Sequence, residues 1–125
     1  MNNTEKPVIF IDHRKKRIRI HRYILKLLGD PKYIQILVNP KSSSLAIRRC
    51  EKNSRLALKL PNKKTESCEL YSTNLINLFY DICSKWDPQA QYRLIGKMSD
   101  GKSIACFRLQ ESELYKETEM TTKDE

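Results

Sequence analysis

The sequence predicts an α+β fold in a single domain, residues 1–125, built from two tandem strand-helix-hairpin units of βαββ type. Three observations lead to this prediction. Short β-branched and apolar runs alternate with segments of helical spacing. Each helical segment ends at an Asp-Pro pair, and two hairpins of equal length recur at one fixed offset. The length allows one hydrophobic core and is too short for two.

The first unit, about residues 8–60, begins with a hairpin and a short helix. The strand-type run Val8–Ile11 and the alternating segment Ile18–Ile20 flank a basic turn, which is the pattern of two paired strands. Apolar residues at helical spacing over 22–28 predict a helix, and Gly29 is the residue type that commonly ends one.

A second hairpin completes this unit. Tyr33–Val38 is rich in β-branched residues and nearly all apolar, which predicts a buried strand, and Leu45–Arg49 returns as its partner. Alternating leucines over 56–60 predict one more short strand. The loop at 61–64 is the expected boundary between the units.

The second unit, about residues 66–110, repeats this order. A strand at Glu69–Tyr71 precedes a capped helix that runs from about residue 72 to residue 86. Strands at 92–98 and 103–109 flank an Asp-Gly pair, which is a strong hairpin signal.

The two hairpins share one register. Setting Tyr33 over Tyr92 aligns 45–49 with 104–108 at an offset of 59 residues without a gap. One short helix cannot cover both faces of a three-stranded sheet, so two packed copies of the unit are the economical arrangement. Chance similarity between two hairpins is the alternative.

Hydropathy predicts a cytoplasmic protein without a membrane partner. No stretch approaches 18 consecutive apolar residues, and the first six residues are polar. The acidic tail, residues 111–125, has low apolar content and is expected to be flexible.

The four cysteines, Cys50, Cys68, Cys83 and Cys106, are predicted to be free thiols. Their spacings of 18, 15 and 23 residues contain no C-x-x-C pair or neighbouring histidine of the kind that zinc sites use. We therefore expect no metal and no cofactor, with metal ligation or disulfides as the minority alternative.

The sequence does not indicate an enzyme. The two histidines, His13 and His21, have no carboxylate or cysteine at metal-ligand or triad spacing. Asp30 and Asp87 each precede a proline at the end of a predicted helix, where aspartate is common because its side chain can hydrogen-bond to the backbone of the turn. We therefore do not interpret them as a general acid and base. The three glycines are too scattered for a phosphate-binding loop.

Charge is the feature that indicates a partner. The net charge is +9, but residues 1–64 hold 17 Lys/Arg and 4 Asp/Glu, a net +13, whereas residues 65–125 hold 7 and 11, a net −4. Such asymmetry attracts polyanions. Lysines that only keep a small domain soluble are the alternative.

A basic segment and a second cationic cluster form the candidate site. The arginine fork suits phosphate oxygens and guanine edges, which makes an arginine-rich patch well suited to nucleic acid. On a strand, Arg17 and Arg19 share one face while Ile18 and Ile20 share the other. The predicted nucleic-acid-binding residues are Arg14, Lys15, Lys16, Arg17, Arg19, Arg22, Arg48 and Arg49.

The segment Arg17–Gly29 resembles the strand-helix signature of AbrB/MraZ-type swapped-hairpin transcription factors, in which an arginine-led strand precedes a short helix ending in Leu-Gly. The tandem repeat is also similar to the MraZ branch. The resemblance implies that Arg17 contacts DNA, helped by Arg14, Lys15 and Lys16. The whole chain also resembles small uncharacterised proteins of Gram-positive bacteria and their mobile elements.

The sequence thus predicts a DNA-binding regulatory or accessory protein that uses the basic segment. The alternative is a protein-interaction module whose basic face meets an acidic protein surface, and an enzyme is the least favoured interpretation. The sequence leaves a homodimer open.

Overall fold

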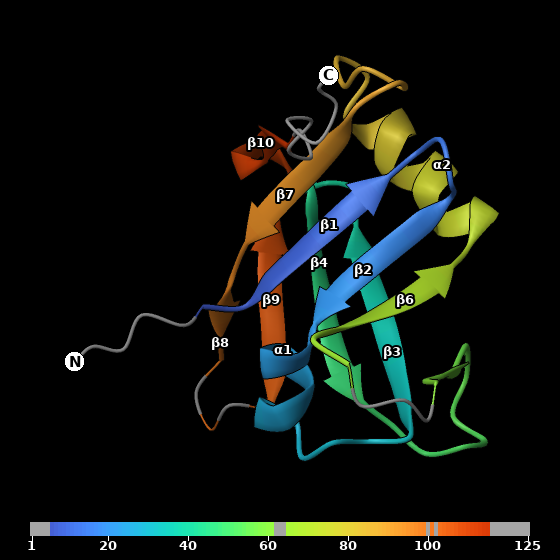
Figure 1. Cartoon of the computed structure of the whole chain (residues 1–125), viewed down its shortest axis with the longest axis vertical. Coiled ribbons are helices and arrows are strands. Elements are labelled where there is room, and N and C mark those ends of the chain that lie inside the picture. Colours follow the sequence, from blue (N-terminus) through green and yellow to red (C-terminus); the bar gives the residue numbers. More distant parts are fainter. Residues whose placement is uncertain (1–5, 62–64, 100, 102, 116–125) are drawn as a thin grey trace, which may run out of the picture.

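The structure is a computed structural model that describes residues 6–61, 65–99, 101 and 103–115. Within these residues the fold is mostly β, because ten strands form two five-stranded antiparallel sheets (Figure 1). Two helices connect strands, and only one of them exceeds two turns. The predicted α+β fold of strand-helix-hairpin units is therefore wrong.

The first sheet, sheet A, has the strand order β10-β7-β1-β2-β6. Ile9 lies opposite both Ile20 and Leu94, so that the apolar residues of adjacent strands form continuous rows on one face. The strands are β1 Val8–Asp12, β2 Arg17–His21, β6 Ser67–Tyr71, β7 Gln91–Ile95 and β10 Glu113–Tyr115.

The second sheet, sheet B, has the order β5-β3-β4-β9-β8. Ile47 lies opposite Ile36 and Ala105, and Leu45 lies opposite Phe107, which again makes one apolar face. The strands are β3 Tyr33–Asn39, β4 Ser44–Arg49, β5 Leu58–Lys59, β8 Lys97–Met98 and β9 Ile104–Arg108.

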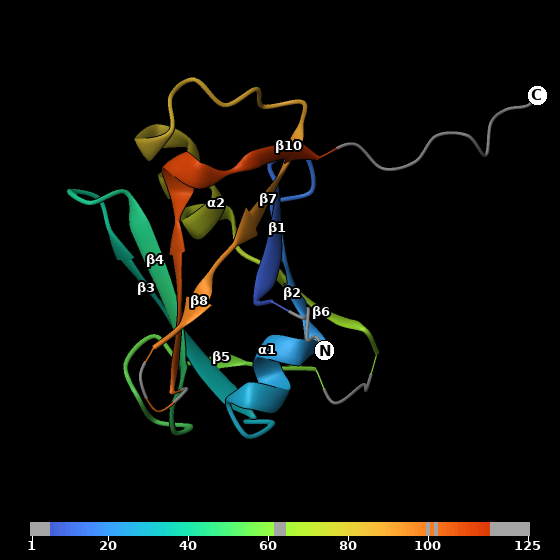
Figure 2. The same ribbon diagram turned by 90° about the vertical axis from the view of Figure 1, so that its left-hand side faces the viewer.

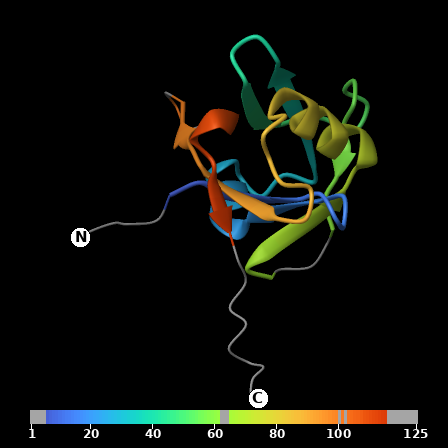
Figure 3. The same cartoon turned by 90° about the horizontal axis from the view of Figure 1, so that it is seen from above.

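The two sheets face each other, and both helices, α1 Arg22–Leu27 and α2 Thr73–Ile82, lie between them near opposite ends of the molecule (Figures 2 and 3). Phe79 of α2 and Phe107 of β9 are among the largest fully buried side chains. The apolar faces of the sheets and helices thus form one core. The outer face of each sheet is not covered by either helix.

The two hairpins and the helix predicted for residues 8–49 are confirmed as local elements. The β1–β2 and β3–β4 hairpins form as predicted, and α1 occupies most of the predicted helix. The His21 side chain accepts a hydrogen bond from the Tyr23 backbone N–H at the start of α1, and Gly29 follows its end with a φ of +87°. The strand predicted at 56–60 contains only two residues.

The second unit departs from the prediction at Gly96. Its predicted strand, 92–98, divides there: β7 pairs with β1 in sheet A, whereas β8 pairs with β9 in sheet B. A Cβ atom at Gly96 would lie 2.3 Å from the Cys106 carbonyl oxygen, so the absence of a side chain allows the chain to cross between sheets. The two hairpins are therefore not equivalent. Their registers also differ, because Val38 pairs with Leu45, whereas Lys97, the residue 59 positions later, pairs with Cys106 and not with Ile104.

Two further details differ from expectation. Helix α2 is capped by Ser72, whose hydroxyl accepts a hydrogen bond from the Leu75 backbone N–H, and it ends at Ile82, four residues before the predicted end. The first residues of the acidic tail are ordered, because Leu109–Glu111 form a 3-10 turn and β10 pairs with β7.

Residues 62–64, in the expected boundary loop, and 116–125 lie outside the described residues. No helix in the described ranges is long and apolar enough to span a membrane.

Candidate nucleic-acid interface

The predicted basic segment begins in the turn between β1 and β2. Arg14 and Lys15 are exposed there. Lys16 is half-buried with a φ of +51°, and its Nζ lies 2.8 Å from Asn77 Oδ1 and 2.9 Å from His13 Nε2. Lys16 therefore connects the turn to α2, which leaves Arg14 and Lys15 as the solvent-facing cations of this turn.

Arg17 is buried rather than presented to a ligand. Its side chain is 7% exposed, its Nη2 lies 3.1 Å from Asp12 Oδ2, and its Nη1 lies 3.2 Å from Glu69 Oε2. Asp12 itself is 5% exposed. Because two carboxylates already neutralise the guanidinium, the residue that the family resemblance assigned to DNA contact has a structural role in this sheet.

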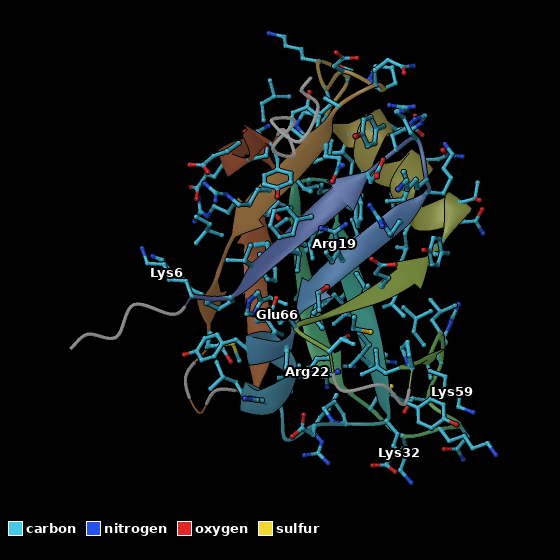
Figure 4. All side chains as sticks on the ribbon, in the orientation of Figure 1. Lys6, Arg19, Arg22, Lys32, Lys59 and Glu66 are labelled. Carbon is cyan, nitrogen blue, oxygen red and sulfur yellow. The ribbon has the colours of Figure 1, made fainter. Side chains whose placement is uncertain are left out.

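Arg19 and Arg22 also contact groups of their own chain. The Arg19 Nε lies 3.6 Å from Glu69 Oε2, and its guanidinium carbon lies 5.8 Å from the Phe10 ring centroid, within cation–π range. The Arg22 Nε donates to the Thr65 carbonyl oxygen at 2.9 Å, and its Nη1 lies 3.8 Å from Asp30. Figure 4 shows Arg19 and Arg22 well apart from Lys59 of sheet B.

The outer face of sheet A is electrically balanced. One cross-strand row runs Glu113, Arg93, Phe10, Arg19 and Glu69, and Arg93 forms an ion pair with Glu113. The five strands hold three arginines and three carboxylates in all, namely Arg17, Arg19, Arg93, Asp12, Glu69 and Glu113. This face offers a polyanion little net attraction.

Sheet B differs, because its five strands contain no Asp or Glu. By the alternation of side chains, the residues on its outer side are Tyr33, Gln35, Leu37, Asn39, Ser44, Ala46, Arg48, Lys59, Lys97, Ile104, Cys106 and Arg108, of which Gln35 is buried. We call this set the B face. Its four cations, Arg48, Lys59, Lys97 and Arg108, are all exposed.

Two cations of the B face, Arg48 and Arg108, make contacts within the chain but remain exposed to solvent. Arg48 Nε donates to the Gln35 side chain at 2.8 Å while the residue remains exposed. Arg108 lies 4.0 Å from Glu111, and both of these side chains are more than 60% exposed. Exposed pairs of this kind contribute little free energy and exchange readily for another anion.

A groove of ≈ 900 Å³ adjoins the B face at its β8 edge. Its lining includes three cations, Lys6, Lys97 and Arg108, together with Glu111. The groove extends the positive surface around the edge of the sheet toward the end of β7.

Of Arg48 and Arg49, the two predicted residues outside the segment 14–22, only Arg48 belongs to the B face. The Arg49 Nη1 donates to the Leu28 carbonyl oxygen at 3.3 Å, where a cation stabilises the C-terminal end of α1. The sequence prediction missed Lys59, Lys97 and Arg108, because they are isolated in the sequence and the fold brings them together. The signal that could have found them is the lack of acidic residues over 52–65, 88–99 and 101–110, which contain Lys59, Lys97 and Arg108 respectively.

The described residues hold no group of three or more His, Cys, Asp or Glu that could bind a metal ion. The four cysteines are free thiols, and burial raises the pKa of Cys68 and of Cys83 above the ordinary thiol value. Burial likewise raises the pKa of Tyr80, whose hydroxyl donates to the Ala90 carbonyl oxygen at 3.2 Å. These groups are held in their neutral forms within the core and at its margin.

The B face is thus a described surface on which four exposed cations lie on strands without carboxylates, and the basic turn of Arg14 and Lys15 is another group of exposed cations, on the other sheet. Comparisons of the chain with protein-family models, with curated proteins and with solved structures find no match.

Proposed function

We propose that this chain binds nucleic acid through the B face. The observation that carries the proposal is the absence of carboxylates from all five strands of sheet B, in a sheet whose outer side presents Arg48, Lys59, Lys97 and Arg108. Phosphate groups are the anions that such a surface attracts over a wide area.

Electrostatics favours the B face over the segment 14–22. A phosphate that approaches Arg17 must compete with Asp12 and Glu69, which already lie within 3.2 Å of its guanidinium. A phosphate that approaches Lys97 displaces only water and counterions, and release of those counterions is the main source of affinity for a nucleic-acid backbone.

Two variants with equal loss of charge test the proposal. The B-face variant carries Lys59→Ser, Lys97→Ser and Arg108→Ser. The control variant carries Arg14→Ser, Lys15→Ser and Lys26→Ser, which are exposed cations of the described chain outside sheet B. Fluorescence anisotropy with a labelled DNA of mixed sequence, repeated at several salt concentrations, gives the affinity and its salt dependence.

We expect the B-face variant to flatten the slope of log affinity against log salt by about 0.9 per lost phosphate contact, or about 2.7 in all. The control variant should lose less than about one unit. An equal or larger loss in the control would place binding at the basic turn and overturn the proposal. Absence of binding by the wild type at about 50 mM salt would overturn it too, and would favour an acidic protein surface as the partner.

A further inference from the structure

The cations of the B face are arranged around an aliphatic centre. One cross-strand row runs from Leu37 through Ala46 and Cys106 to Lys97. Arg48 is two residues from Ala46 along β4, on one side of this row. Arg108 is two residues from Cys106 along β9, on the other side of the row. The positive charges therefore border the strip on both sides and at one end.

Strand geometry gives the scale of this arrangement. Adjacent strands are about 4.8 Å apart, and successive outward residues on one strand are about 6.8 Å apart. Arg48 and Lys97 are separated by two strand spacings and by two residues along the strand direction, so their Cα atoms are roughly 12 Å apart. Arg48 and Arg108 lie on adjacent strands and four residues apart along the strand direction, so their Cα atoms are roughly 14 Å apart. These spans are close to the width of the major groove of B-form DNA, about 12 Å, across which phosphates of the two strands face each other.

The B face lacks the side chains that hold unpaired bases. Proteins that bind single strands stack successive bases on aromatic rings, at about 1–3 kcal/mol per base. Tyr33 is the one aromatic residue among the solvent-facing residues of sheet B that the structure describes, and it lies beside Lys59 at a corner. The centre of the face offers Leu37, Ala46 and Cys106 instead.

The aromatic residues of the other outer face do not compensate for this. Phe10 and Tyr115 pack against each other with ring centroids 4.6 Å apart, and Tyr71 is exposed, but all three belong to sheet A. There the neighbouring arginines pair with carboxylates. Among the residues of the described strands, the outer side of sheet A thus has more rings, whereas that of sheet B has more cations without a carboxylate in the neighbouring strands.

We propose that the B face binds double-helical DNA through phosphates on both sides of one groove, without preference for base sequence. This inference rests on the proposed function of the same face. Backbone contacts fix the position of a protein on a duplex and carry no sequence information. The centre of the B face offers a base edge only the Cys106 thiol, a weak hydrogen-bond donor.

The experiment compares four ligands with the wild-type chain by anisotropy at one salt concentration. They are a 20-base-pair DNA duplex, one of its single strands, a second DNA duplex of unrelated sequence, and an RNA duplex. We expect the first duplex to bind at least about tenfold more tightly than its single strand, because the duplex has the higher charge density. The two DNA duplexes should agree within about threefold, since phosphate contacts do not distinguish bases. The RNA duplex should bind more weakly, because its major groove is deep and narrow.

A gain-of-function variant separates the stacking argument from the charge argument. Cys106→Tyr places a ring in the aliphatic centre at a position that is exposed. We expect this variant to bind the single strand severalfold more tightly, which corresponds to the lower end of the range for one stacked base. Its affinity for the duplex should change little.

The outcomes distinguish the two proposals. Single-strand binding as tight as duplex binding, or a preference above about tenfold between the two DNA duplexes, would overturn this inference and leave nucleic-acid binding by the B face intact. Failure of all four ligands to bind would overturn the proposed function itself.

Discussion

Sheets A and B have the same number of strands and the same antiparallel pairing, yet they use arginine in opposite ways. In sheet A, Arg17 and Arg93 each meet a carboxylate of a neighbouring strand, and the charges hold the sheet together. In sheet B, Arg48 and Arg108 face solvent without any carboxylate in the strands beside them. The comparison shows that a cation in the sequence indicates a binding surface only when its cross-strand neighbours are known.

The largest expected effect is on stability, from the buried ion pair of sheet A. Arg17→Met leaves the Asp12 carboxylate buried without its partner, and we expect the free energy of unfolding to fall by about 3–5 kcal/mol. The matched change in sheet B, Lys97→Met, should alter it by less than about 0.5 kcal/mol, because Lys97 is exposed. Urea denaturation of both variants measures the contrast.

A double variant tests whether the unpaired Asp12 carboxylate causes this loss of stability. Asp12→Leu added to Arg17→Met removes the uncompensated charge and should recover much of the loss. If the double variant is no more stable than Arg17→Met, or if Lys97→Met costs as much, the distinction between structural and free cations does not hold.

The second effect concerns the residue that joins the sheets. Gly96→Ala places a Cβ atom 2.3 Å from the Cys106 carbonyl oxygen and 2.6 Å from the Phe107 ring, both parts of the sheet B framework. We expect destabilisation of about 1–3 kcal/mol, because the strands must separate to admit it. Gly101→Asn is the control: Gly101 has open space around it and a φ of +77°, which asparagine tolerates. Equal melting temperatures for the two variants would contradict the steric account.

The smallest effect leaves stability unchanged and compares the thiols of the two sheets. Cys106 lies exposed on the B face, whereas Cys68 is buried on the inner face of sheet A. Burial raises the pKa of Cys68, so less of the reactive thiolate forms near pH 8. We expect a disulfide reagent to modify Cys106 first and Cys68 last, with the Cys68 rate still rising with pH above the ordinary thiol value of 9.0.

Single-cysteine variants followed by mass spectrometry give the two rates. DNA should slow the modification of Cys106 and leave that of Cys68 unaffected, because Cys106 lies at the centre of the B face. Protection of neither thiol by saturating DNA would show that the ligand binds elsewhere.

Local elements were predictable from the sequence, whereas their assembly was not. Short apolar, β-branched or alternating runs are sufficient to predict β1, β2, β3 and β4, because each depends on its own residues and on the adjacent turn. The division at Gly96 depends on contact with Cys106 and Phe107, which are ten or more residues away. Nothing local marks a glycine in a strand pattern as the point where the chain changes sheets.

The candidate site was predictable only in part, for a related reason. Density of charge along the sequence identifies the segment 14–22, but two of the carboxylates that neutralise it, Glu69 and Asp30, are eight or more residues from its end. The B face gathers single cations from strands more than 45 residues apart, such as Arg48 and Lys97. The sequence alone shows where cationic residues are clustered. It does not show which of them form ion pairs with carboxylates that are distant in the sequence.

The short outer strands of sheet B have one further consequence. β5 and β8, which form its two edges, each contain only two residues, whereas the edge strand β6 of sheet A contains five. An exposed strand edge is a template on which another chain can add a strand, and very short or lysine-bearing edges suppress such addition. Each of these two edges also carries a lysine, Lys59 or Lys97. These edges would therefore resist the addition of a strand from another molecule, including molecules that the proposed binding to nucleic acid would bring close together.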